Sequence, residues 1–259
     1  MFIELLGHRV HTMASGRGDR TLLGIAGAFG NMEIWQQPFE LLSRRYATIA
    51  YDHFGTGETR VPPELVTFDN QVALLEALMD GFSLDRCTLL ADSTMVGVAV
   101  AVAARCPERI DALALVAGGV INRRDELTEG FVSRLRSNFE PTVERFVALC
   151  IPESETAHLR DWLRDIIHRT GAERAASLIE SFYDVDVSEL LPKLVMPTVV
   201  IQGEHDALPT SNLDAARAMA ARIPDCRLEI LPGAGHVPTL TRPKEVADII
   251  ERLIETRAP

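Results

Sequence analysis

The segment that decides the fold runs from residue 87 to residue 116, CTLLADSTMVGVAVAVAARCPERIDALALV. Residues 87–90 form a short apolar run of strand type, and residues 94–105 form a longer run of small apolar residues with the length of a helix. Pro107 ends that helix, and residues 110–117 form a second apolar strand. A strand, a helix and another strand in this order predict two parallel strands joined by a crossover helix.

The same alternation continues on both sides of this segment. Strands are expected at residues 2–6, 9–13, 21–26, 46–51, 198–202 and 227–231. Helices are expected at residues 35–43, 68–80, 212–222 and 243–254. The sequence therefore predicts an α/β fold with a mostly parallel central sheet and helices on both of its faces.

Between the strands at 110–117 and 198–202 the alternation stops. Helices rich in charged residues are expected there at 131–139, 142–149, 157–169 and 172–183. We assign residues 1–117 and 192–259 to the α/β core and residues 118–191 to an inserted helical lid. Ligands bind at the carboxyl ends of parallel strands, so an insertion at a strand end is placed to cover that edge. The alternative is a peripheral subdomain with no such role.

Composition narrows the class of protein. The 259 residues are 47% hydrophobic and 24% charged, which is typical of a globular chain. The net charge of −11 argues against a nucleic-acid partner, because binding phosphates needs clustered Lys and Arg. The longest apolar run, residues 95–104, is too short to span a membrane. The four cysteines form no CxxC pair. We expect a cytoplasmic protein. Its expected partner is a small-molecule substrate, with no nucleic acid and no membrane. The sequence does not predict an oligomeric state.

Three side chains follow apolar strands and therefore reach the same sheet edge: Ser93, Asp206 and His236. A hydroxyl, a carboxylate and an imidazole together can form a nucleophile, an orienting acid and a general base. Taken singly, the serine is more simply a helix cap, the aspartate a turn residue and the histidine a surface residue. A metal site from His205, Asp206 and His236 lacks a known ligand spacing, so we expect no metal and no cofactor.

The chain resembles the α/β-hydrolase superfamily over essentially its whole length. The resemblance rests on Gly27 after an apolar strand, YDHFGTG at 51–57, AARCPERI at 103–110, GEHD at 203–206, GAGHVP at 233–238 and PKEV at 243–246. It implies that Ser93, Asp206 and His236, in that order, are the catalytic triad. It also implies that the backbone amides of Ala28 and Thr94 form the oxyanion hole.

The segment around Ser93 departs from the superfamily's G-x-S-x-G pattern. Ala91 and Met95 stand in place of the two glycines, and Ala26 stands in place of the histidine of the His-Gly turn. Asp92 as the nucleophile, as in a dehalogenase, is the alternative to Ser93. Pro107 follows Ser93 by fourteen residues, which matches the superfamily's interval and favours the serine.

The expected activity is hydrolysis of a small carboxylic ester, thioester or lactone through a serine acyl-enzyme intermediate. The same triad also suits a carbon–carbon bond hydrolase, a perhydrolase or an acyltransferase. A weakly active or inactive small-molecule binding protein is a further alternative, favoured by Ala26, Ala91 and Met95. Phe29 and Trp162 are candidates for an apolar substrate pocket, with packing as the equal alternative.

Overall fold

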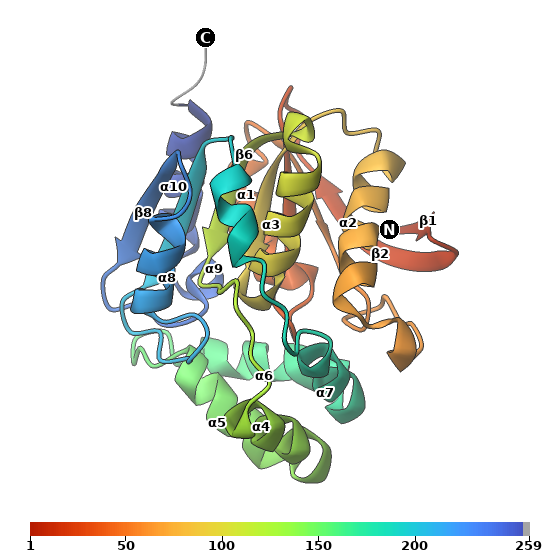
Figure 1. Cartoon of the computed structure of the whole chain (residues 1–259), viewed down its shortest axis with the longest axis vertical. Coiled ribbons are helices and arrows are strands. Elements are labelled where there is room, and N and C mark those ends of the chain that lie inside the picture. Colours follow the sequence, from red (N-terminus) through yellow and green to blue (C-terminus); the bar gives the residue numbers. More distant parts are fainter. Residues whose placement is uncertain (256–259) are drawn as a thin grey trace.

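The computed structural model describes residues 1–255, which form a single eight-stranded sheet with helices around it (Figure 1). The strand order is β1-β2-β4-β3-β5-β6-β7-β8. Strands β1 and β2 pair antiparallel, as do β2 and β4, and every other neighbouring pair is parallel. The strands are β1 Phe2–Leu5, β2 His8–Ser15, β3 Thr21–Ile25, β4 Ala47–Tyr51, β5 Cys87–Asp92, β6 Ile110–Val116, β7 Thr198–Gly203 and β8 Cys226–Leu231. This arrangement confirms the predicted fold class.

Helices cover both faces of the sheet because each central strand is apolar on both sides. In β3, Leu23 packs into the core that contains α2 and α3, and Leu22 packs into the core that contains α1 and α10. The first core lies under α2 Phe68–Gly81, α3 Val96–Arg105 and α8 Leu213–Ala220. The second lies under α1 Gln36–Leu42, the short α9 Pro238–Thr241 and α10 Pro243–Glu255. The two cores together bury both faces of the sheet, as is usual for parallel strands.

The insertion after β6 consists of four helices, which lie together below the sheet in Figure 1. They are α4 Glu126–Ser137, α5 Phe139–Cys150, α6 Leu159–Thr170 and α7 Ala172–Glu180. The chain enters and leaves this group side by side, because Ile121 and Asp186 form an antiparallel bridge. The amide of Val187 donates to the carbonyl of Val120 at 2.9 Å next to that bridge. The four helices therefore begin and end at the same place on the sheet edge.

Most element boundaries differ from the sequence-based expectation by one to three residues, and two differences have a clear local cause. Helix α4 begins at Glu126, five residues before the expected start at 131. Asp125 and Thr128 form a reciprocal capping box there, which satisfies amides that a helix start otherwise leaves unpaired. The expected helix at 94–105 begins instead with a 3-10 turn, η3 Ser93–Met95. The remaining 3-10 turns are η1 Met32–Trp35, η2 Pro63–Leu65, η4 Pro107–Arg109 and η5 Ser188–Lys193.

None of the helices between residues 1 and 255 is long and apolar enough to cross a membrane. The four cysteines are free thiols, and Cys87 and Cys150 are buried.

Candidate active site

Ser93 lies on a tight turn between β5 and η3. Its φ angle is +52°, a left-handed conformation that a serine adopts only when its surroundings hold it there. A Cβ atom on Gly27 would lie 2.7 Å from Ser93 Cβ, and one on Gly118 would lie 2.4 Å from the Ser93 carbonyl oxygen. The glycines that permit this turn therefore come from the ends of β3 and β6. The side chain of Met95 is fully buried in the core beside α3.

The three side chains expected at the sheet edge do converge. Ser93 Oγ lies 2.9 Å from Nε2 of His236. The other ring nitrogen of His236, Nδ1, lies 2.8 Å from Oδ2 of Asp206. The serine follows β5, the aspartate follows β7 and the histidine follows β8. The parallel strand ends therefore bring Ser93 to two residues that lie more than a hundred positions further along the chain. His205 does not join them: its side chain is exposed and faces Glu204 at 4.0 Å.

Asp206 is buried and accepts more hydrogen bonds than the triad alone requires. Gln202 Nε2 and Ser211 Oγ lie 3.0 and 3.1 Å from its Oδ2 atom, and the amide of Leu208 donates to its Oδ1 atom at 3.0 Å. Ser211 Oγ also lies 3.2 Å from His236 Nδ1. These donors hold the carboxylate in one orientation. Gln202 and Ser211 are not predicted from the sequence, where their only signal is a position at or near the loop that follows β7.

The charge state of His236 is set by two opposing effects. Burial lowers the pKa of the imidazole, but the nearby Asp206 carboxylate, through its charge and its hydrogen bond, outweighs burial and raises the pKa above its usual 6.5. The Asp92 carboxyl adds to the increase. An imidazole stabilised in its protonated form suits a group that accepts a proton from the adjacent hydroxyl.

The loop that carries His236 is held by residues from the insertion. The amide of His236 donates to the carbonyl of Cys150 at 2.8 Å, and the amide of Gly235 donates to Glu153 Oε1 at 2.8 Å. A Cβ atom on Gly235 would lie 2.3 Å from Pro152 Cδ, so only glycine allows this approach. The histidine loop and the end of α5 therefore form one packed unit.

The Gly27 loop after β3 lies against Ser93. Ala28 and Thr94 both line the cavity in front of the serine. Thr94 is the second residue of η3, where an amide has no partner within the helix. The buried ring of His53 supports this loop, with Nε2 3.1 Å from the carbonyl oxygen of Gly27. His53 thus contacts the backbone next to Ala26, the residue that stands in place of the superfamily's histidine.

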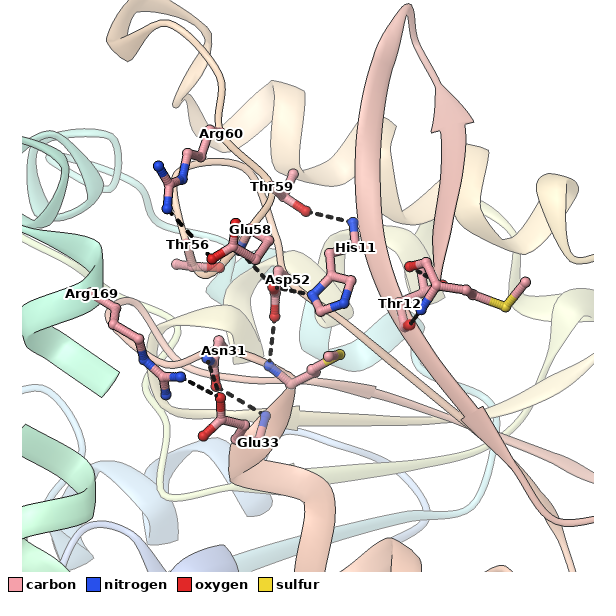
Figure 2. Close-up of polar contacts among 12 residues, drawn as sticks. His11, Thr12, Asn31, Glu33, Asp52, Thr56, Glu58, Thr59, Arg60 and Arg169 are labelled. Carbon is pink, nitrogen blue, oxygen red and sulfur yellow. Dashed lines mark hydrogen bonds and ion pairs between the residues drawn. The ribbon is translucent and has the colours of Figure 1, made fainter. Parts of the chain in front are cut away.

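A polar network fixes the chain just beyond this loop. Figure 2 shows Asp52 facing His11, and Glu33 facing Arg169. Asp52 Oδ1 accepts from the Met32 amide at 3.0 Å, and Asp52 Oδ2 lies 3.0 Å from His11 Nδ1. Glu33 Oε1 lies 2.8 Å from Arg169 Nη1 of α6. The insertion is therefore tied to this side of the site as well as to the histidine loop.

Asp92 is a further carboxyl group at the site. Its side chain is buried and lines the cavity, and its Oδ1 atom has no hydrogen-bond partner among the described residues. The amide of Gly27 donates to this carboxyl group. Burial raises the pKa of Asp92 to about 7, against the opposing effects of His236 and of the Gly27 amide. Asp92 therefore changes charge near neutral pH, directly beside Ser93.

A cavity of about 1200 Å³ opens in front of Ser93 and His236. Phe29 lies in its wall, together with residues of α4, α5 and α7. Trp162 does not line this cavity, so its assignment to the pocket is corrected. The indole N–H of Trp162 donates to Glu33 Oε2 at 3.0 Å, which directs that ring to the outer junction between α6 and η1.

A parallel sheet that presents a serine, a histidine and an aspartate in mutual contact beside a cavity defines a hydrolase of the serine type. The sequence model of the alpha/beta hydrolase family matches residues 22–249, and the chain belongs to that family.

Relatives and structural neighbours extend over nearly the whole chain. The pimeloyl-(acyl-carrier protein) methyl ester esterase of Nitrosomonas europaea is 26% identical, over 94% of this chain and 99% of its own length. Strigolactone esterase D14 of Arabidopsis thaliana is 23% identical, over 92% of this chain and 94% of its own length. The crystal structure of the enol-lactonase from Burkholderia xenovorans superimposes with a TM-score of 0.90 at 20% identity, covering 98% of this chain and all of that one.

Proposed function

We propose that this protein hydrolyses small carboxylic esters, thioesters or lactones through a covalent acyl-enzyme formed on Ser93. The observation that carries the proposal is the chain of contacts from Ser93 Oγ through the His236 ring to Asp206, at 2.9 and 2.8 Å. The esterase names of the two relatives and the lactonase name of the neighbour agree with it.

In the acylation step, Ser93 Oγ attacks the carbonyl carbon while His236 Nε2 takes the hydroxyl proton. The tetrahedral intermediate collapses, and the same proton passes to the leaving alcohol or thiol. A water molecule then attacks the acyl-enzyme, with His236 again accepting and returning a proton. The acid is released and Ser93 is restored. In each step one proton passes through His236 Nε2, so the atoms and charges of the reaction balance without a cofactor.

The remaining assignments follow from the positions of the partners. Asp206 holds the His236 tautomer that has a free Nε2, and its charge stabilises the imidazolium that forms. The amides of Ala28 and Thr94 stabilise the negative oxygen of the intermediate, supported by their position in the cavity wall beside Ser93. The start of the η3–α3 segment adds a favourable dipole at the same point.

We assign residues 118–191 the role of a lid over this cavity. The support is that α4, α5 and α7 supply wall residues such as Phe131, Phe146 and Ile179. A cytoplasmic location is the matching proposal for the whole protein, supported by its free thiols.

The test combines covalent labelling with turnover. A fluorophosphonate reacts with an activated serine, so we expect stoichiometric labelling at Ser93 in the wild type and none in Ser93→Ala. On a panel of short nitrophenyl esters, thioesters and lactones, Ser93→Ala should lose activity by about 10³-fold or more. Exposed Ser137→Ala, a serine of α4, is the matched control. Unchanged turnover in Ser93→Ala would overturn the mechanism, and labelling without turnover of any substrate would support the binding-protein alternative.

A further inference from the structure

Two arginines in the cavity wall have no partner among residues 1–255. The chain carries a net charge of −11, and nearly every described guanidinium group contacts a carboxylate, a carbonyl oxygen or an aromatic ring. Among residues 1–255, the guanidinium groups with no such contact are those of Arg17, Arg44, Arg123, Arg134 and Arg145. Arg123 interacts electrostatically with the carboxylates of Asp125 and Asp186. Arg123, Arg134 and Arg145 line the cavity in front of Ser93. Of these three, Arg134 and Arg145 are the two with no carboxylate acting on them among the described residues.

These two arginines lie on neighbouring helices and are exposed. Arg134 belongs to α4 and Arg145 to α5, and Asn138 alone joins the two helices. Both helices belong to the insertion, at the end of the molecule away from the upper edge of the sheet in Figure 1. The positive groups therefore lie at the part of the cavity that the insertion forms, where solvent reaches them.

An aromatic wall connects this region to the reacting serine. Phe29, which follows the Ala28 amide, has its ring centroid 6.1 Å from that of Phe131 and 5.2 Å from that of Phe146. The Phe131 and Phe146 centroids are 5.7 Å apart. Phe131 lies one helical turn before Arg134 on α4, and Phe146 directly follows Arg145 on α5. A path along the wall thus runs from the oxyanion loop over aromatic rings to the two guanidinium groups.

The charges along this path differ in sign. The inner end holds the buried carboxyl of Asp92 next to Ser93, and the outer end holds Arg134 and Arg145. A negative group on a bound substrate is attracted to the guanidinium groups at the outer end, which the aromatic wall separates from Ser93. An ester carbonyl at Ser93 is compatible with an anion only if an apolar segment separates the two.

We propose that the cavity selects esters or thioesters that carry an anionic group beyond an apolar segment, with Arg134 and Arg145 binding that anion. The proposal rests on the proposed function, whose reaction the same cavity performs. Guanidinium groups suit it because they form paired hydrogen bonds with carboxylate and phosphate oxygens. The shared chemistry of the ligand is a terminal anion, either a carboxylate on the acyl part or a phosphate on the leaving group.

The experiment compares substrates that carry an anionic group with related substrates that lack it. One pair is the monomethyl and dimethyl esters of straight-chain dicarboxylic acids with four to eight carbons. The other pair is the coenzyme A and N-acetylcysteamine thioesters of one medium-chain acid, in which only the first leaving group carries phosphates. The readout is the ratio of kcat/KM for the anionic to the neutral member, at low and at high salt. In the wild type we expect a ratio of about ten or more for one pair, falling as salt screens the charges.

The variant Arg134→Gln/Arg145→Gln should lower that ratio about tenfold, mainly through KM, because an anchoring contact remote from the reacting bond changes ground-state and transition-state binding alike. Arg17→Gln/Arg44→Gln is the matched control, since it removes two equally unpartnered, exposed arginines outside the cavity. It should leave the ratio as in the wild type. If the ratio of the ester pair falls in the cavity variant, the bound anion is a carboxylate on the acyl part. If the ratio of the thioester pair falls, the bound anion is a phosphate on the leaving group.

The outcomes separate this inference from the proposed function. Hydrolysis of the neutral members with a ratio near one in the wild type, or a ratio that the cavity double variant leaves unchanged, overturns the anion site alone. Failure of the wild type to hydrolyse any member of either pair, together with no labelling of Ser93, overturns the proposed function itself.

Discussion

Glu153, a buried residue just after the end of α5, accepts a hydrogen bond at 2.8 Å from the amide of Gly235, the residue directly before His236. The same carboxylate oxygen accepts from Thr241 Oγ1 at 3.1 Å. The insertion therefore does more than line the cavity. It supplies one of the groups that fix the position of the imidazole, so the geometry of the triad depends on the packing of α5.

The first prediction concerns this contact. Glu153→Ala leaves the Gly235 amide buried without an acceptor, which costs about 1–3 kcal/mol of unfolding free energy. It also frees the histidine loop to move, and small displacements of a catalytic group can lower kcat by on the order of 10²-fold. Glu153→Gln keeps an acceptor oxygen and should retain most of the activity. The measurements are kcat, KM and the pH profile of each variant beside a denaturant titration. A Glu153→Ala protein that is destabilised but has wild-type kcat would show that the contact is purely structural.

The sequence predicted the sheet and the triad because both depend on local patterns. The apolar runs before Ser93, Asp206 and His236 identify parallel strands, and parallel strands end at one edge. The supporting contacts have no such pattern. Glu153, Ser211 and Gln202 act through tertiary neighbours, and a lone polar residue in a loop looks the same whether it is buried or exposed.

The turn at Ser93 illustrates the same limit. The sequence shows that Ala91 and Met95 replace the superfamily's glycines, but it does not show which residues make room for the turn. In the structure that room comes from Gly27 and Gly118, which belong to other strand ends. The misassignment of Trp162 has a similar origin. An indole on an amphipathic helix suits a pocket and an interhelical contact equally, and the Glu33 carboxylate decides between them.

The second prediction concerns Asp206 and pH. His236 must be neutral to accept a proton, so kcat/KM should rise with pH through a pKa above 6.5, as the Asp206 carboxylate requires. In Asp206→Asn two effects on the imidazole remain: burial, which lowers its pKa, and the smaller effect of the Asp92 carboxyl, which raises it. The rising limb of the profile should move to lower pH, and kcat should fall by roughly 10⁴-fold. Asp214→Asn, an exposed aspartate at the start of α8, is the control. A rising limb that stays in place in Asp206→Asn would contradict the assignment of the pair.

The third prediction concerns Asp92 and stability. Its pKa is about 7 in the folded protein and 3.8 when unperturbed, so folding takes up a proton between these values. Raising the pH through this window therefore destabilises the wild type, by about 1.4 kcal/mol for each unit of pKa increase. Asp92→Asn keeps an oxygen for the Gly27 amide and removes the charge. The Tm of Asp92→Asn minus the Tm of the wild type, measured from pH 5 to pH 8, should increase up to about pH 7 and then level off. Exposed Asp85→Asn should show a flat difference. A flat difference for Asp92→Asn too would mean that the carboxyl is ionised throughout this range.

The fourth prediction concerns the Gly27 loop. A methyl group at Gly27 would lie 2.7 Å from Ser93 Cβ and 3.3 Å from Ser93 Oγ, closer than the backbone of either residue allows without movement. Gly27→Ala should therefore displace the loop that carries the Ala28 amide. Loss of one oxyanion donor lowers kcat by about 10²–10³-fold, and we expect a fall in that range with little change in KM. The control is Gly97→Ala in α3, where a Cβ meets only ordinary contacts at 3.7 and 3.9 Å. That variant should keep its activity and gain stability, since alanine favours a helix over glycine by about 1 kcal/mol. Wild-type kcat in Gly27→Ala, measured on the neutral ester series, would show that the loop does not hold the oxyanion.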